Sequence, residues 1–382
     1  MTRAPSVIVV GGGAIGLACA WALARRGAEV TVLERFGLVH DRGSHSGHTR
    51  VIRQAYYEGS SYVPLIQQAD AQWVGLQQRA GRALLERCGV LLFGPPDDPE
   101  LGAAIETCER CGVPSSVYDG AQARARWPVS MPDDWVACFD PSGGYLRVRP
   151  CMEAMAHEAR AAGATLRYPV TVESLRLEDP LAVQLADGER VRADRVVVAA
   201  GAWLPQLCPT LLPGRLQRLR RILAWTTPAP EHREALADMP VWGAFLPDGF
   251  YYGFPYGNEG TPGLKLAVHT SSTQPGLARP VDPDAVDRAA HPSDLEPLRR
   301  VLAEHLPRGQ GPITSTHACL YTATDSWDFL VDRLPDDPRV IVAGGMSGHG
   351  FKFAPAIGMH VAALLLDDAA PRPDLSVAAH MA

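Results

Sequence analysis

The strongest constraint on the fold lies in residues 1–34, which predict a strand, a glycine turn, a helix and a second strand. Residues 7–10 are β-branched throughout, as in a buried parallel strand. Residues 11–16 have the spacing G-x-G-x-x-G, and a helical pattern follows up to Gly27, the expected C-terminal cap. A second strand-like run then ends at Glu34. This order predicts a complete dinucleotide-binding unit and therefore a parallel α/β sheet.

The residues of this turn suit particular contacts with a dinucleotide. Gly11 permits the tight turn, Gly13 lets the backbone approach a pyrophosphate, and Gly16 lets the helix pack against the strand. The amide groups at the start of the helix would bind the pyrophosphate, and Glu34 would bind a ribose hydroxyl. The pattern does not distinguish FAD from NAD.

The rest of the chain mixes strands and helices. Two further strand-like runs, 195–201 and 339–345, also end in glycine. The pattern predicts a helix over 148–163 and a hairpin over 181–191, while the stretch from about 215 to 315 alternates strand-like and Pro-rich pieces. Because the three buried strands are far apart in the sequence, we expect one α/β domain built from discontinuous segments, with a separate β-rich layer.

Composition limits the partners. The net charge is −6 and no basic tail or stripe is present, which argues against nucleic-acid binding. No window approaches the ~18 apolar residues of a membrane span, and no secretory signal is evident. The eight cysteines are scattered along a long chain, so we expect them to be reduced. These features predict a cytoplasmic protein that binds neither nucleic acid nor a membrane.

Two short motifs are weak indications of a metal or redox role. Cys108 and Cys111 form a lone C-x-x-C with no second pair at zinc spacing. His45 and His48 have no cysteine partner nearby. We therefore expect no metal site.

Two glycine-rich segments carry cationic side chains. Residues 43–53 contain two arginines and suit a loop beside a phosphate or a flavin, although a solvated polar loop is equally compatible. Residues 344–353 contain four glycines, with Lys352 between two phenylalanines. Because this loop precedes a predicted helix, contact with an anion or a cofactor is favoured over a surface role. Among the 36 lysine and arginine residues, only Lys352 and Lys265 are lysines.

Together these segments resemble the family of monomeric sarcosine oxidase and N-methyltryptophan oxidase, flavoproteins of the D-amino acid oxidase superfamily. The matching segments occur in the family's order along nearly the whole chain, and they are 11–16 with Glu34, 43–53, 252–255, 263–265, 319–322 and 347–352. The glycines near the N-terminus are generic to flavoproteins. The segments that contain Cys319 and Lys352 are more specific.

The resemblance implies an α/β fold with a Rossmann-type FAD-binding domain and a second, β-rich (α+β) substrate domain. The FAD-binding domain would comprise residues 1–87, 146–215 and 320–382, and the substrate domain would comprise residues 88–145 and 216–319. The resemblance also implies a monomer.

FAD would lie extended in the α/β domain, attached by a thioether from Cys319 to the flavin 8α-methyl group. A thiolate is a good nucleophile toward that activated methyl group. Without the resemblance, Cys319 would be interpreted as a small buried hydrophobic residue. The other residues that the resemblance places at the cofactor are Gly11, Gly13, Ile15, Gly16, Glu34, Arg35, Ser44, Thr49, Arg50, Val172, Gly201, Gly345, Gly348, His349, Gly350 and Lys352.

The resemblance implies further roles in substrate binding and catalysis. Arg53 and Lys352 would hold the substrate carboxylate, the arginine as a fork and the lysine as a point charge. Lys265 would promote the reaction with oxygen by stabilising the developing superoxide charge, and Arg50 would lie near the flavin ring. The pocket would also contain His269, as a catalytic residue, with Tyr252 and Tyr321.

Four positions depart from the family's pattern. Ser46 and His48 stand where a second histidine and an aspartate are common. Met346 replaces the usual aromatic residue, and Trp327 lies in a segment that is usually acidic. We therefore expect a substrate pocket that differs from one for sarcosine.

The sequence thus predicts a flavin-dependent oxidase of a secondary amino acid, either N-methylated or cyclic. The amine must be neutral to give up hydride, and a cationic site favours that form. Hydride transfer would give an imine, and reoxidation by O2 would give H2O2. The alternatives are a flavin dehydrogenase with a different acceptor, an NAD-dependent dehydrogenase and a non-catalytic flavin-binding protein. The sequence does not select the substrate.

Overall fold

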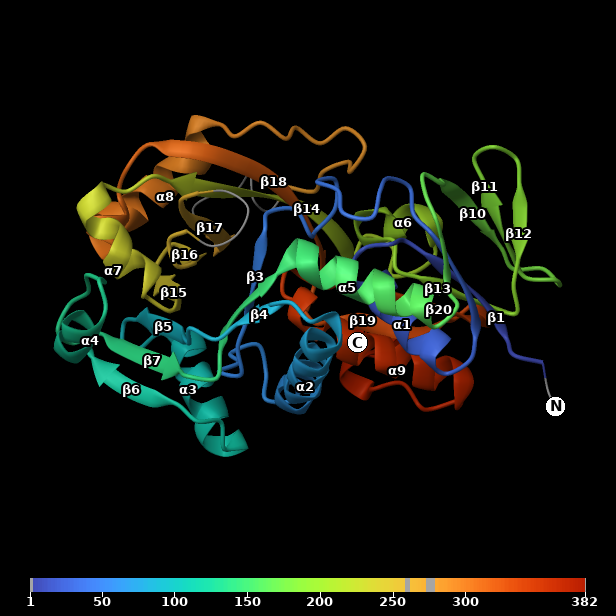
Figure 1. Cartoon of the computed structure of the whole chain (residues 1–382), viewed down its shortest axis with the longest axis horizontal. Coiled ribbons are helices and arrows are strands. Elements are labelled where there is room, and N and C mark those ends of the chain that lie inside the picture. Colours follow the sequence, from blue (N-terminus) through green and yellow to red (C-terminus); the bar gives the residue numbers. More distant parts are fainter. Residues whose placement is uncertain (1–2, 258–261, 273–278, 382) are drawn as a thin grey trace.

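The computed structural model describes residues 3–257, 262–272 and 279–381. Its first sheet has six strands in the order β19-β20-β13-β1-β2-β9 (Figure 1). Pairing is parallel throughout except between β19 and β20. The strands are β1 (Ser6–Val10), β2 (Glu29–Leu33), β9 (Thr165–Arg167), β13 (Arg195–Val198), β19 (Leu330–Leu334) and β20 (Asp337–Gly344). The three predicted buried strands therefore lie side by side, as expected.

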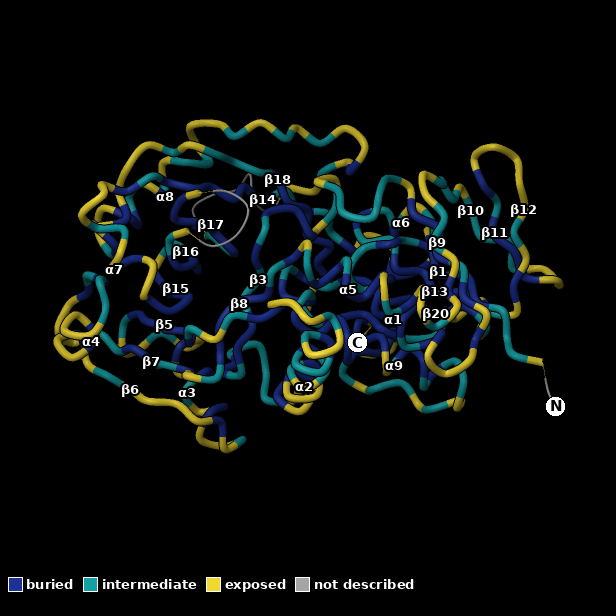
Figure 2. The backbone as a smooth tube through the Cα atoms, viewed as in Figure 1, coloured by how far each residue is buried: buried dark blue, intermediate teal, exposed yellow. Residues whose placement is uncertain are grey.

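Successive side chains of β1 point to opposite faces of this sheet, and both faces are buried. Val7 and Val9 pack in a core with the helices that cover one face, while Ile8 and Val10 pack in a second core on the other face. The covering helices are α1 (Ala14–Arg25), α2 (Tyr62–Ala80), α5 (Val148–Ala161) and α9 (Ala354–Leu366). On the opposite face lie α6 (Leu204–Leu207) and the hairpin strands β10 (Val172–Arg176), β11 (Ala182–Leu185) and β12 (Arg190–Arg192), with an exposed tip in Figure 2.

The second large sheet has eight strands in the order β18-β14-β17-β16-β15-β5-β7-β6. It is mixed, because β15 pairs with β5 in parallel while its other pairs are antiparallel. Its strands are β5 (Val90–Gly94), β6 (Ser116–Asp119), β7 (Val136–Asp140), β14 (Leu216–Thr226), β15 (Val241–Leu246), β16 (Gly249–Gly253), β17 (Leu264–Ser271) and β18 (Ile313–Thr324). The accompanying helices are α3 (Pro99–Cys111), α4 (Gly120–Arg126), α7 (Arg233–Ala237) and α8 (Pro292–His305).

A small sheet joins the two parts of the molecule. It consists of β3 (Thr49–Ile52), β8 (Gly144–Arg147) and β4 (Leu85–Glu86). The strand β18 also links the parts, because residues 325–329 alone separate it from β19 of the parallel sheet. The predicted boundary between residues 319 and 320 falls inside β18, so the exact division into domains remains a proposal.

The sequence pattern missed helix α8 in the stretch expected to be β-rich. This helix begins at Pro292 and contains Pro297, and those prolines obscured its helical pattern. Three leucines and valines of its buried face, Leu298, Val301 and Leu302, pack in the core of the large sheet. Tertiary packing therefore stabilises a helix whose local signals are poor.

Other expectations from composition can be compared with the structure. All eight cysteines are free. Within residues 3–257, 262–272 and 279–381, histidine, cysteine and acidic side chains form no group of three that could hold a metal ion. No helix in the described part of the chain combines the length and apolar character needed to cross a bilayer.

Candidate active site

A cavity of about 620 Å³ runs from the glycine turn after β1 into the space between the two large sheets. One end is formed by residues after β1, β2 and β13, and the other by side chains of β5, β15, β16, β17 and β18. The carboxyl ends of parallel strands are the usual place for a nucleotide in such folds. The volume of the cavity lies within the usual range for small-molecule sites.

The glycine turn leaves room for a ligand at one of its three positions. A Cβ atom on Gly16 would lie 1.8 Å from the Gly11 carbonyl oxygen, and one on Gly11 would lie 2.5 Å from the Ala199 oxygen. These two glycines therefore allow α1 and β13 to pack against the turn. A Cβ on Gly13 would meet nothing closer than His45 Nδ1, at 3.9 Å, so the backbone at Gly13 is open to the cavity.

Glu34 is fixed at the end of β2. Its Oε2 accepts a hydrogen bond from the Gly12 amide at 2.7 Å, and its Oε1 accepts one from the Phe36 amide at 2.7 Å. The carboxylate is buried and lines the cavity. It therefore lies beside the glycine turn, as the dinucleotide-binding pattern predicts.

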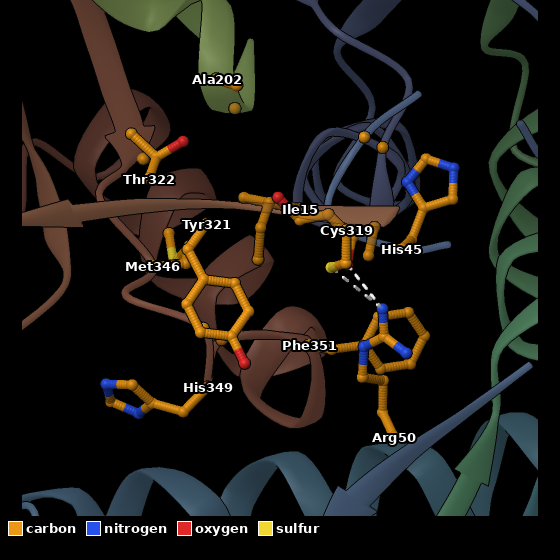
Figure 3. Close-up of a pocket in the computed structure, with 18 of the residues that line it drawn as sticks. Ile15, His45, Arg50, Ala202, Cys319, Tyr321, Thr322, Met346, His349 and Phe351 are labelled. Carbon is orange, nitrogen blue, oxygen red and sulfur yellow. Dashed lines mark hydrogen bonds between the residues drawn. The ribbon is translucent and has the colours of Figure 1, made fainter. Parts of the chain in front are cut away.

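Cys319 lies on β18 and faces the cavity next to Arg50, as Figure 3 shows. Its sulfur donates to the Ser44 carbonyl at 3.3 Å and lies 3.8 Å from Arg50 Nη2. The guanidinium of Arg50 also donates to four backbone carbonyls, those of Ser44, Ser46, Gly47 and Thr49. Arg50 thus holds the 44–49 turn around itself and presents a fixed cation beside the thiol.

Lys265 lies one layer behind this wall. It is fully buried on β17, and its ammonium donates to the Thr49 carbonyl at 2.8 Å and to Thr49 Oγ1 at 3.1 Å. The ring of Phe254 lies 4.4 Å from Nζ. Burial and the charge of Arg50 lower the pKa of Lys265 well below its usual range. The turn that carries Arg50 therefore separates Lys265 from the cavity.

Arg53 enters the cavity after β3 as part of a buried ion pair. Its Nη2 lies 2.7 Å from both oxygens of Glu58, and its Nη1 donates to the Ala55 carbonyl at 2.5 Å. The rings of Tyr56 and Tyr57 each lie 4.5 Å from the guanidinium. Burial alone would raise the pKa of Glu58, but the charge of Arg53 lowers it to about 2. Glu58 is therefore ionised at neutral pH.

Lys352 lies in the short 3-10 helix Phe351–Phe353 and also lines the cavity. Its Nζ donates to the His349 carbonyl at 3.0 Å and lies 5.2 Å from the ring of Tyr56. Burial, and then the charge of Arg53, lower the pKa of Lys352 to about 7. Two buried cations from separate segments thus share one region of the cavity, and one of them titrates near neutral pH.

An aromatic wall stands beside these cations. His269 Nδ1 lies 3.0 Å from the Tyr321 hydroxyl, and Tyr252 lines the cavity next to them. Burial and the charge of Arg221 lower the pKa of His269 to about 3, so its imidazole is neutral. Burial raises the pKa values of both tyrosines above their usual range. The wall is therefore polar but uncharged.

His349 has two defined partners. Its Nε2 lies 3.0 Å from the Trp327 carbonyl oxygen, which can only accept, so this nitrogen carries the proton. Its Nδ1 then accepts from the Tyr56 hydroxyl at 2.5 Å. Burial lowers the pKa of His349 to about 4, which agrees with a neutral ring. The imidazole therefore joins the Arg53 loop to the loop that contains Trp327.

The structure brings most of the predicted site residues to this one cavity. Gly16, Thr49 and Lys265 do not line it, because they lie behind Gly11, Arg50 and the 47–49 turn. The predicted residues that line it are Gly11, Gly13, Ile15, Glu34, Arg35, Ser44, Arg50, Arg53, Val172, Gly201, Tyr252, His269, Cys319, Tyr321, Gly345, Gly348, His349, Gly350 and Lys352.

The sequence pattern did not identify several lining residues. Glu58 is the most important of them, because its carboxylate is already paired with the Arg53 guanidinium. An acid five residues after an arginine is too common a pattern to predict this pair from the sequence. Tyr57, Trp242 and Phe250 extend the aromatic wall, and their positions carried no signal beyond ordinary burial. Asp284 lines the end of the cavity near Arg35, although it lies in a distant segment between β17 and α8.

The four departures from the family's pattern have defined places. Ser46 Oγ donates to the Ala318 carbonyl at 2.8 Å, which fixes the turn next to β18. The His48 ring lies 5.7 Å from the ring of His317. Met346 lines the cavity. Trp327 has a left-handed backbone, with φ of 65°, and its ring lies 5.6 Å from that of His269.

These features fit FAD. A helix N-terminus with one open glycine, followed by a fixed carboxylate, suits the pyrophosphate and ribose of a dinucleotide. The cavity then continues past a thiol and a cation into a pocket with aromatic walls and two buried cations, which has groups suited to a second ring system and a small acid.

Comparison with known proteins agrees with this geometry. Residues 6–364 match the family model described as FAD dependent oxidoreductase. The chain is 33% identical to the monomeric sarcosine oxidase of Bacillus sp. (strain B-0618), over 94% of this chain and 92% of that protein. It is also 33% identical to the N-methyl-L-tryptophan oxidase of Yersinia pestis (strain Pestoides F), over 97% of each chain.

The fold is likewise similar to solved structures. The open form of NikD, described as an unusual amino acid oxidase essential for nikkomycin biosynthesis, superposes with a TM-score of 0.82. That similarity covers 97% of this chain and 96% of NikD, at 26% identity. L-proline dehydrogenase from P. horikoshii has a TM-score of 0.78 at 23% identity, over 98% of this chain and 96% of that one, which indicates the shared fold alone.

Proposed function

This chain belongs to the family of FAD-dependent oxidoreductases, and we propose that it oxidises a secondary amino acid, N-methylated or cyclic, with oxygen as the electron acceptor. The observation that carries the proposal is the pair of buried cations, Arg53 and Lys352, beside an uncharged aromatic wall in the cofactor cavity. Relatives named for oxidation of sarcosine and N-methyl-L-tryptophan support the same chemical class.

The residues of the glycine turn would hold the FAD. The open backbone at Gly13 and the first amides of α1 would bind its pyrophosphate, and Glu34 would bind a ribose. When bound, FAD supplies the acceptor for a hydride from the substrate carbon and passes the electrons on to oxygen. We also propose that Cys319 attaches it covalently, since its sulfur faces the cavity beside the fixed guanidinium of Arg50 and a thiol sulfur is a suitable nucleophile.

Arg53 and Lys352 would bind the substrate carboxylate. Arg53 offers a planar fork, and Lys352 a compact charge that needs a partner to stay protonated. In the structure Arg53 is paired with Glu58, so a carboxylate would have to share or displace that contact. Binding of the acid group would hold the rest of the substrate against His269, Tyr252 and Tyr321.

The aromatic wall would favour the neutral amine. His269 is neutral, and the two cations at Arg53 and Lys352 disfavour another positive charge nearby. A neutral amine has the lone pair that drives loss of hydride from the adjacent carbon. The product imine would leave the cavity for hydrolysis if acyclic, or remain as a cyclic imine.

Lys265 would assist the reaction with oxygen from behind the cavity wall. Its ammonium is held by Thr49, next to the segment that carries Arg50. A negative charge in the cavity would raise the pKa of Lys265 and keep it protonated, and the protonated form would stabilise charge as oxygen is reduced.

The test is a spectrum of the purified protein during a screen of N-methyl and cyclic amino acids, first under nitrogen and then in air. Bleaching of the flavin by one of these classes, followed by peroxide formation in air, is the expected result. Bleaching without peroxide would instead indicate a dehydrogenase with another acceptor. No bleaching with any secondary amino acid would contradict the proposal.

A matched variant tests the attachment. Cys319→Ala should release its flavin on acid precipitation, whereas the unaltered protein should keep it, because no other thiol lines the cavity among the described residues. Flavin that stays attached in Cys319→Ala would show that the site of attachment is wrong.

A further inference from the structure

Residues 279–291, which we call the nucleotide strap, precede α8 and contact both the large mixed sheet and the loop after β2 of the parallel sheet. On one side the Val281 amide donates to the carbonyl of Arg218, in β14, at 2.7 Å. On the other side Arg288 donates to the carbonyls of Asp41 and Arg42, both at 3.0 Å. In Figure 1 this orange coil crosses the top of the molecule. The strap therefore spans the two parts of the chain.

Asp284 is the strap residue that reaches the cavity. Its Oδ1 accepts from Arg35 Nη1 at 2.6 Å and from Trp203 Nε1 at 3.0 Å. Its own amide donates to Asp282 Oδ1 at 3.0 Å, which fixes the local turn. Asp284, Arg35 and Trp203 all line the cavity, so this contact lies at one of its ends.

That end is the one expected to hold the adenosine of FAD. Arg35 follows Glu34 directly, and an acid at the end of this strand marks the ribose position in a dinucleotide-binding unit. Phe36 and Trp203 have ring centroids 5.5 Å apart, and the Arg35 guanidinium lies 5.7 Å from the ring of Trp203. The proposed flavin and substrate contacts belong to other elements, which include β3, β16, β17, β18 and the 3-10 helix Phe351–Phe353.

We propose that Asp284 is a positioning residue for the adenosine half of FAD, and that the nucleotide strap makes the protein retain FAD in preference to FMN. By accepting from both Arg35 and Trp203, Asp284 holds a cation and an aromatic ring against this end of the cavity. FMN lacks the adenosine half and cannot use these groups. The proposal depends on FAD as the cofactor and not on the identity of the amino acid substrate.

The test measures how tightly apoprotein binds each flavin. Apoprotein carrying Cys319→Ala, made in riboflavin-limited cells, is titrated with FAD and with FMN. Asp284→Ala should weaken FAD binding by about fivefold to tenfold, as expected for loss of charge-assisted hydrogen bonds, and change FMN binding by less than about twofold. Asp284→Asn, which keeps an acceptor oxygen, should have a smaller effect on FAD.

Asp287→Ala is the matched control in the same strap. The Asp287 carboxylate pairs with His291 at 2.6 Å and does not line the cavity, so its loss should leave the preference for FAD unchanged. Equal weakening of FAD and FMN by Asp284→Ala, or no weakening of FAD, would overturn the proposal. If the apoprotein aggregates, the rate of FAD release from loaded Cys319→Ala protein provides the same comparison. Asp284→Ala should raise this rate and Asp287→Ala should not, and equal rates in the two variants would also overturn it.

Discussion

Lys265 and Lys352 are the only lysines in the chain, and both are buried. Their surroundings nevertheless differ. Lys265 is enclosed by β17 neighbours and the 47–49 turn, whereas Lys352 faces the cavity. An arginine at each position would keep the charge but needs more space and a different hydrogen-bond geometry. The same conservative substitution should therefore have two different consequences.

We expect Lys265→Arg to destabilise the protein by about 1–3 kcal/mol, because a larger head group must fit a fully enclosed site. Lys352→Arg should change stability by less than about 1 kcal/mol but raise KM for the amino acid, since its head group can extend into the cavity. Chemical denaturation and steady-state kinetics measure the two effects. Equal loss of stability in both variants would contradict this difference.

The pKa of Lys352, lowered to about 7, predicts a pH dependence of ligand binding. Below that pH the lysine is protonated and attracts a carboxylate; above it the neutral amine loses this attraction. We expect affinity for an unreactive carboxylate without an amine to fall on the order of tenfold from about pH 6.5 to about 8.5. Flavin absorbance changes on titration report the binding.

The neighbouring groups do not titrate in that window. Glu58 has its pKa lowered to about 2, and burial lowers those of His349 and His269 to about 4 and about 3. Lys352→Met should therefore bind the carboxylate weakly and with no pH dependence there. An unchanged pH profile in that variant would assign the titration to another group.

At the scale of elements, two glycines of the β1–α1 turn have different surroundings: Gly16 is enclosed by backbone, and Gly13 is open to the cavity. Gly16 is required for packing, because any side chain there would collide with the Gly11 carbonyl. Gly13 has a φ of −70°, which other residues adopt, and open space beside its Cα. Packing therefore gives no reason for a glycine at position 13, which agrees with the proposal that the pyrophosphate approaches the backbone there.

Gly13→Ala should fold normally yet bind FAD at least about tenfold more weakly, because its methyl group would occupy the space next to the pyrophosphate. Gly16→Ala should lose about 3 kcal/mol or more of stability even without flavin. Thermal melts of apoprotein and flavin titrations distinguish the two. Normal FAD affinity in Gly13→Ala would mean that the pyrophosphate lies elsewhere.

The elements also show where sequence patterns are limited. The strand at residues 6–10 and the helix at 14–25 could be predicted because their signals are local: β-branched residues, glycine spacing and a capping glycine. Helix α8 could not, since its prolines disrupt the pattern and its buried face depends on the large sheet. The eight-stranded sheet also recruits residues 90–140, which no local signal assigns to it.

For the whole molecule, the cavity between the two large sheets implies that FAD contributes to their joint stability. The lining residues come from both sheets, and the nucleotide strap adds a further contact between them. A ligand that binds only the folded form stabilises everything that forms its site. The apoprotein should therefore depend on direct contacts between the two parts.

We expect FAD at about 100 times its Kd to stabilise Cys319→Ala apoprotein by about 2.7 kcal/mol, with both parts unfolding in one transition. Differential scanning calorimetry of apoprotein with and without FAD measures this effect. FMN, which cannot reach the strap, should give a smaller shift at the same concentration. Two separate transitions in the presence of FAD would show that the cofactor does not couple the two parts.

The sequence by itself determined the dinucleotide-binding unit and the family, and most of the site residues predicted from it line the cavity, because these signals lie in short segments with fixed spacing. Only the tertiary structure decided that Glu58 pairs with Arg53, that Lys265 lies behind Thr49 at a separation of 216 residues, and that Asp284 meets Arg35 at one end of the cavity. Such contacts depend on strand register and on how the two sheets pack. These are properties of the whole chain, and no short segment contains them.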